Sequence, residues 1–141
     1  MNDYVYSTSK DLLAQGRIVG IVGGEHSVPL GLIKALGERY SSFGVLHIDA
    51  HADLREAYEG FQYSHASIMY NVLHEVPQVT GVTQVAIRDF CDQEYRLIQT
   101  DERITSFPDF QIKKSLFEGE SFASLCDRIV NSLPDNVYIS F

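Results

Sequence analysis

The sequence has little positive charge and no long apolar run. Lys and Arg number 11 against 19 Asp and Glu, for a formal net charge of −8. This excess of acid argues against non-specific binding to nucleic acid or to an anionic membrane. No apolar run approaches the length of a membrane span, and residues 1–10 lack the basic start and apolar core of a signal peptide. We therefore expect a cytoplasmic protein with neither a nucleic-acid nor a membrane partner.

Cysteine is also scarce, and repeats and low-complexity tracts are absent. Cys91 and Cys126 lie far apart and in no metal-ligand spacing, so we expect reduced thiols and no disulfide framework. With 45% apolar and 21% charged residues, the 141-residue chain has the composition of an ordinary globular domain. We predict one α/β domain over residues 1–141.

Short apolar runs alternate with helical patterns along the chain. The expected strands are 17–22, 43–48, 83–88, 103–107 and 137–141. The expected helices are 27–40 with Ser27 as a cap, about 66–76, 92–99, and 121–133 with Ser121 as a cap. This alternation predicts a three-layer, mostly parallel sheet with helices on both faces. Because the final run stops at Phe141 with no loop after it, we expect the domain to be incomplete.

Ionisable residues follow two of the expected strands. The run 17–22 leads into Glu25 and His26, and the run 43–48 leads into Asp49, His51 and Asp53. Sites in open parallel sheets form beyond the carboxyl ends of strands. In an extended segment every second residue points to the same side, which would bring the last three side chains together.

Such a cluster of acids needs a compensating charge. Two carboxylates about 4 Å apart repel by roughly 4 kcal/mol at an effective dielectric constant near 20. Imidazoles without thiolates favour a cation that accepts mixed oxygen and nitrogen ligands. Mn²⁺ fits this donor set, while Zn²⁺, Fe²⁺ and Co²⁺ stay open. Two metal ions with one bridging carboxylate also fit the donors.

The segment with Glu25 and His26 and the segment with Asp49, His51 and Asp53 are each weak evidence alone, because such a segment is more often a capped turn than a metal site. The two segments together, each after an expected parallel strand, favour a metal site. Of the other histidines, His47 lies inside a strand and is expected to be packed or to support a ligand. His74 lies late in a helix and is expected to face solvent. The pattern around His65 leaves its role open.

The sequence carries GGEHS at 23–27, DAHAD at 49–53 and SHAS at 64–67, and ends in YISF at 138–141. Together these motifs resemble those of the ureohydrolase family, which includes arginase and agmatinase. The order matches the family signatures GG-[DE]-H-S, D-A-H-x-D, a histidine in an S/D-H-[GA] context, and S-F-D-x-D. The resemblance covers the chain from about Gly16 onward. It implies that the family's first strand is missing upstream, so we expect an arginase-like domain that is truncated at both ends.

The resemblance implies a role for each of these residues. His26 and Asp53 would bind the first of two Mn²⁺ ions, His51 would bind the second, and Asp49 would bridge them. His65 would be the catalytic histidine that moves protons. Glu25 would at most support a ligand. The implied reaction is hydrolysis of a small guanidino substrate with release of urea.

Some expected residues are not in this sequence. The Asp-x-Asp of the fourth signature and the later glutamate of the family are absent from the 141 residues. We expect this chain alone to be inactive or nearly so. The resemblance also implies a trimer or hexamer of the longer protein.

Substrate choice depends on the loop 55–67. Its candidate substrate-binding residues are Arg55, Tyr58, Glu59 and Tyr63. An acidic residue there would favour a cationic tail such as the amine of agmatine, and Arg55 would favour a carboxylate. The pattern around His65 resembles agmatinase more than arginase.

Three alternatives stay open. The DAH triplet also opens the metallophosphoesterase motifs, but their later signatures are missing. Another enzyme of the arginase fold, such as a formiminoglutamase or a deacetylase, is the second. The third is a non-catalytic domain that only binds metal.

Overall fold

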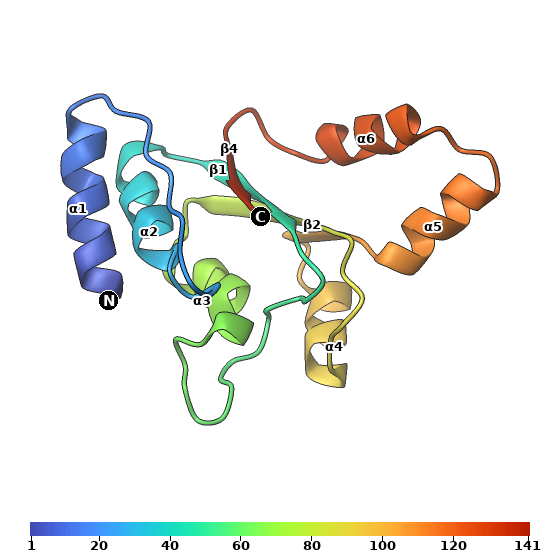
Figure 1. The fold of residues 1–141 in the computed structure, drawn as a ribbon, viewed down its shortest axis with the longest axis horizontal. Helices are drawn as coiled ribbons and strands as arrows, with labels where there is room; N and C mark the ends of the chain where they lie inside the picture. Colours follow the sequence, from blue (N-terminus) through green and yellow to red (C-terminus); the bar gives the residue numbers. More distant parts are fainter. The chain divides into compact units, whose positions relative to one another are not determined.

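The computed structural model describes residues 1–141, which group into two compact units. The first unit comprises Met1–Ser42 and Asp53–Val79, and the second comprises Phe43–Ala52 and Thr80–Phe141. Figure 1 shows the helices and strands of both units along the chain. Each unit is described by itself below.

The second unit is built on a four-stranded sheet. Its strands are β1 (Phe43–Ile48), β2 (Val79–Val85), β3 (Ile104–Phe107) and β4 (Val137–Ser140). Their order is β3-β2-β1-β4, and β1 with β4 and β2 with β3 pair in parallel. Figure 1 shows β4 alongside β1 although about 90 residues separate them in sequence. The expected parallel sheet is confirmed, while the placement of helices on both of its faces stays a prediction.

The strand β1 shows the alternation that the sheet requires. Phe43, Val45 and His47 are buried, whereas Leu46 and Ile48 are partly exposed. Successive side chains of a strand point to opposite faces, so one face of β1 is fully packed. This packing places the ionisable residues after Ile48 at the carboxyl end of a strand that is inside the sheet.

Three helices belong to the second unit, and local hydrogen bonds define two of their starts. They are α4 (Asp92–Thr100), α5 (Asp109–Phe117) and α6 (Phe122–Asn131). Cys91 and Glu94 form a capping box at α4, and Ser121 Oγ accepts a hydrogen bond from Ser124 N at α6. The predicted Ser121 cap is confirmed, whereas α5 was not predicted.

The first unit consists of helices and loops. Its helices are α1 (Asn2–Ala14), α2 (Leu30–Arg39), the 3₁₀ turn η1 (His65–Ser67) and α3 (Ile68–Glu75). Figure 1 shows α1 lying along α2. Their close approach depends on Gly31, since a β-carbon there would lie 2.6 Å from Asn2 O and 2.7 Å from Tyr6 N.

Three local predictions were wrong. The strand expected at 83–88 is β2 at Val79–Val85, and Ala86, with a φ angle of 68°, lies beyond its end. Residues 17–22 form no strand, and the side chains of Ile18 and Val22 are fully exposed. A strand needs a neighbouring strand for its backbone hydrogen bonds, and no strand of the 141 residues pairs with this run. Ser27 does not cap α2, because the helix begins after Pro29 without a side-chain cap. A proline suits this position since it has no N–H to satisfy.

No helix of the structure combines the length and apolar character that crossing a bilayer requires.

Candidate functional site

Backbone hydrogen bonds hold the DAHAD segment in place after β1. Arg88 N and Asp89 N both donate to Ala50 O, at 2.8 and 3.0 Å. Ala52 N donates to Asp89 O at 3.3 Å, and His51 and Asp89 form an isolated parallel bridge. The segment that follows β1 is therefore positioned by the segment that follows β2.

Asp49 and His51 form a local pair within the second unit. Asp49 Oδ1 accepts a hydrogen bond from His51 N at 2.9 Å and lies 3.1 Å from His51 Nδ1. His47 Nε2 lies 3.6 Å from the other carboxylate oxygen of Asp49. The His51 side chain is 61% exposed and that of Asp49 is 23% exposed. One carboxylate thus has an imidazole on each of its oxygens, and one of these imidazoles is open to solvent.

Gln84 supports this pair from inside the sheet. It is fully buried on β2, and its Nε2 donates to Ala52 O at 2.7 Å and lies 3.2 Å from His47 Nδ1. His47 is also fully buried, as expected for a packed histidine. Sequence reasoning missed Gln84. The signal that could have found it is a polar residue inside the apolar run 83–88.

His26 and Asp53 form the corresponding pair in the first unit. His26 Nδ1 lies 2.7 Å from Asp53 Oδ2, and the Asp53 side chain is only 5% exposed. The carbonyl of Asp53 accepts hydrogen bonds from Met69 N at 3.0 Å and Tyr70 N at 3.2 Å, in the first turn of α3. The start of this helix therefore fixes the backbone of Asp53.

The conformation of Asp53 corrects one expectation. Its φ angle is 54°, in the left-handed region, so the extended alternation assumed for residues 49–53 does not continue through Asp53. Aspartate tolerates this region better than most residues do. The two pairs lie in different units of the chain, and the peptide bond between Ala52 and Asp53 joins them.

Glu25 and His65 meet in the first unit. His65 Nδ1 lies 3.8 Å from Glu25 Oε2, and both side chains are about half exposed. The Glu25 carboxylate accepts hydrogen bonds from Ser27 N, at 3.2 Å, and from Ser27 Oγ. The catalytic candidate His65 therefore has an anionic neighbour that is itself held in place.

The loop after Asp53 brings two of the four substrate-binding candidates next to His65. The Tyr58 and His65 rings meet edge to face with centroids 5.4 Å apart, and the Arg55 guanidinium lies 5.1 Å from the Tyr58 centroid. Arg55 N also donates to Ala66 O at 3.1 Å, which ties the start of the loop to its end.

The other two candidates lie apart from this stack. Tyr58 and Phe61 exchange backbone hydrogen bonds of 3.0 and 2.9 Å around a turn in which Glu59 and Gly60 have φ angles of 50° and 85°. Glu59 is therefore at the exposed tip of a tight turn. Tyr63 is half exposed, with Lys34 Nζ 5.9 Å from its ring centroid.

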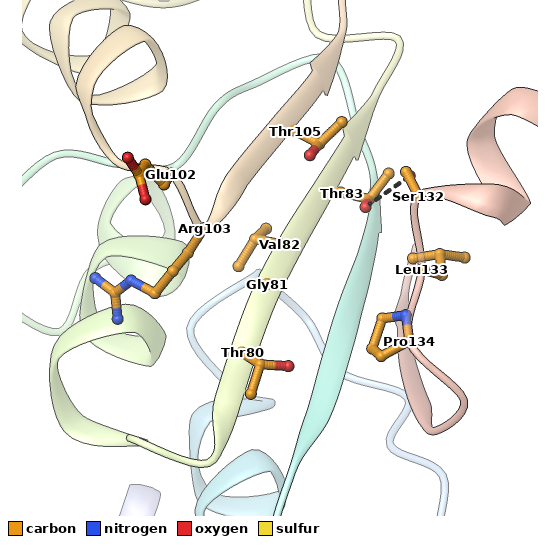
Figure 2. A pocket seen from close by; sticks show the side chains of 10 residues that line it. All are labelled: Thr80, Gly81, Val82, Thr83, Glu102, Arg103, Thr105, Ser132, Leu133 and Pro134. Atoms are coloured by element: carbon orange, nitrogen blue, oxygen red, sulfur yellow. Dashed lines mark hydrogen bonds between the residues drawn. The ribbon is translucent and has the colours of Figure 1, made fainter.

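A hollow of about 270 Å³ lies in the second unit, on residues that the sequence did not single out. Figure 2 shows it along β2 and β3, with the hydrogen bond between Thr83 Oγ1 and Ser132 Oγ dashed. Arg103 lines it but is engaged by Asp101, with Nη2–Oδ2 at 2.7 Å. This hydrogen bond raises the pKa of Arg103 above its usual value. None of the predicted site residues lines the hollow.

Comparison with known proteins identifies relatives of this chain. The profile of the Arginase family matches residues 1–141. N(1)-aminopropylagmatine ureohydrolase of Thermus thermophilus is 38% identical over 129 residues, which are 91% of this chain and 40% of that protein. Agmatinase of Bacillus anthracis is 38% identical over 65 residues, which are 46% of this chain and 22% of that protein. The chain thus spans less than half the length of these relatives.

The fold has a close counterpart among solved structures. Arginase from Bacillus cereus superposes with a TM-score of 0.83 at 21% identity, over 99% of this chain and 52% of that one. At this identity the likeness concerns the fold alone. Since the family profile matches from the first residue to the last, the chain belongs to the arginase family.

Proposed function

We propose that the protein is part of a metal-dependent ureohydrolase that cleaves a carbon–nitrogen bond of a linear guanidino substrate and releases urea. The observation that carries this proposal is a pair of carboxylate–imidazole contacts at two family motifs. They are His26–Asp53 at 2.7 Å and His51–Asp49 at 3.1 Å. Because the chain covers only 40% of its Thermus relative, the activity is proposed for the whole protein.

The donors of the two pairs fit divalent metal ions. Carboxylate oxygens and imidazole nitrogens without thiolates suit Mn²⁺, and also Zn²⁺, Fe²⁺ or Co²⁺. By the family resemblance, His26 and Asp53 would hold one Mn²⁺ and His51 would hold a second, and Asp49 would be a ligand of both. The nearly buried Asp53 carboxylate supports this assignment, because a buried acid is stable only with a hydrogen-bonded or cationic partner.

The reaction also needs a proton carrier, and His65 is the candidate. When bound, the metal ions would make water acidic enough to act as a nucleophile near neutral pH. Hydrolysis adds this water to the guanidino carbon, breaks its bond to the tail nitrogen and leaves urea and an amine. His65 would deliver a proton to the departing nitrogen, a role that suits an imidazole accessible to solvent.

The substrate we propose first is agmatine-like, with arginine second. Two of the relatives are named for agmatine or its aminopropyl derivative. In the loop after Asp53, the guanidinium of Arg55 already stacks on Tyr58, while the Glu59 side chain is exposed at a turn tip. An exposed carboxylate would attract the cationic tail of agmatine more than the zwitterionic end of arginine.

Metal binding tests the proposal directly. Mn²⁺ is titrated into the 141-residue chain and followed by electron paramagnetic resonance, with Asp53→Asn and Asp127→Asn measured alongside. Asp127 is exposed on α6 and serves as the matched control. We expect Asp53→Asn to weaken Mn²⁺ binding by at least about tenfold and Asp127→Asn to leave it unchanged. Equal affinities in all three proteins would contradict the metal assignment.

Activity is measured separately as urea release from agmatine and from arginine with Mn²⁺. The 141 residues hold four of the implied ligands and lack the Asp-x-Asp pair, so we expect little or no urea from this chain. We expect a longer protein that includes this pair to release urea, with agmatine preferred. Turnover by the 141-residue chain at the rate of a full-length relative would contradict this view of the ligand set.

A further inference from the structure

His65 is contacted from two directions by residues of its own unit. The carboxylate of Glu25 lies 3.8 Å from Nδ1, and the edge-to-face contact with Tyr58 has an interplanar angle of 69°. The Arg55 guanidinium lies over the tyrosine ring. The imidazole therefore has an anion at one nitrogen and an aromatic ring beside it.

Glu25 is held in position by the residue two places along the chain. Ser27 donates to both carboxylate oxygens of Glu25, through its backbone N–H to Oε2 and through its hydroxyl to Oε1. The oxygen that faces His65 is Oε2, which is also the oxygen bound by the backbone N–H. The sequence Glu-His-Ser thus aims a carboxylate at a histidine 40 residues further along the chain.

We propose that Glu25 is a positioning residue for His65 and selects the tautomer that carries its hydrogen on Nδ1. A neutral imidazole has one N–H and one lone pair, and the group nearest to each nitrogen decides which carries the hydrogen. A carboxylate attracts the hydrogen to the nitrogen that it faces. At 3.8 Å this attraction acts through charge or through one bridging water rather than through a direct hydrogen bond.

The choice of tautomer matters for the reaction proposed above, on which this role of Glu25 rests. With the hydrogen on Nδ1, Nε2 keeps its lone pair and can take up a proton and release it again. In His65, Nδ1 would then keep its hydrogen toward Glu25, and Nε2 would exchange the proton. In the opposite tautomer the lone pair would face the carboxylate of Glu25, which is unfavourable since both groups are hydrogen-bond acceptors.

The test is nitrogen-15 NMR of the histidine side chains in the metal-free chain, at a pH of about 8.5 where histidine is ordinarily neutral. The variant His65→Gln assigns the His65 signals. We expect the Nδ1–H tautomer to be the major form of His65 in the native chain. Glu25→Gln should shift the tautomer ratio toward Nε2–H by about tenfold, as expected when a charged partner becomes neutral.

Two further variants separate the specific effect from a general one. Ser27→Ala leaves the carboxylate but frees it, so it should shift the ratio in the same direction by a smaller factor. Glu56→Gln removes an exposed carboxylate from the loop next to Tyr58 and should leave the ratio unchanged.

An identical His65 tautomer ratio in the native chain and in Glu25→Gln would overturn the proposal. So would an equal shift in Glu56→Gln. Because the measurement uses no metal and no substrate, its result does not depend on the proposed hydrolysis. A shift by Glu25→Gln together with absent Mn²⁺ binding would retain the positioning role and reject the proposed function.

Discussion

The two carboxylate–imidazole pairs are both built from family motifs but are held by different means. In His51–Asp49 the partners are two residues apart, and a backbone turn brings them together. In His26–Asp53 they are 27 residues apart and meet only because the chain folds back within the first unit. The exposed fractions of the side chains are 61% and 23% in the local pair and 19% and 5% in the distant one.

The two pairs should therefore contribute differently to the stability of the fold. The local pair depends on hydrogen bonds between neighbouring segments and is screened by solvent, so its contribution to stability should be small. The distant pair is mostly buried and involves a residue with a left-handed backbone, so its loss should affect folding. Three substitutions, each measured in metal-free buffer with a chelator, examine the contrast from the largest expected effect to the smallest.

Replacement of Asp53 should have the largest effect. Asp53→Ala removes the partner of a mostly buried imidazole and places alanine at a φ angle of 54°. We expect the free energy of unfolding to fall by about 3 kcal/mol, measured by urea denaturation with far-UV circular dichroism. Asparagine tolerates this backbone angle, so the free energy of unfolding of Asp53→Asn should fall by about half as much. Equal losses in the two variants would show that backbone strain contributes nothing.

Replacement of Gln84 should have an intermediate effect. Gln84→Leu keeps the volume but leaves the Ala52 carbonyl, now bonded at 2.7 Å, without its donor inside the sheet. We expect a loss of about 2 kcal/mol in the same denaturation experiment. Gln93→Leu, at an exposed position of α4, is the matched control and should change stability by less than about 0.5 kcal/mol. A loss in Gln84→Leu no larger than in the control would mean that this amide does not support the DAHAD segment.

Replacement of Asp49 should have the smallest effect on stability. Asp49→Ala removes the acceptor for His51 N, which can bond to water instead because the region is open. We expect a loss of at most about 1 kcal/mol without metal. The same variant should weaken Mn²⁺ binding by at least about tenfold, since Asp49 is proposed to bridge the ions. A larger stability loss than that of Asp53→Ala would reverse the comparison between the pairs.

Several elements were predictable because their signals are local. The run 43–48 forms β1, and the pattern in 27–40 contains α2, at Leu30–Arg39. Ser121 caps α6 as its position before the helix suggested. By contrast, α5 was not predicted, and it has no buried residue.

The runs 17–22 and 43–48 show why similar local patterns can have different outcomes. Both are rich in β-branched or large apolar residues, and both precede ionisable motifs. Only the second has strands beside it, while Ile18 and Val22 of the first are fully exposed. Apolar content therefore predicts the tendency to form a strand, and the presence of a hydrogen-bonding neighbour settles whether one forms.

The kinds of donor atoms at the candidate site, and their order along the chain, are properties of the sequence alone. So are the family motifs and the short separation of Asp49 from His51 along the chain. The meeting of His26 with Asp53, the left-handed backbone of Asp53 and the position of Glu25 beside His65 came from the folded chain. They rest on contacts between residues far apart in sequence. Such contacts form only when the packing of the whole chain offsets the entropic cost of closing the loops between those residues.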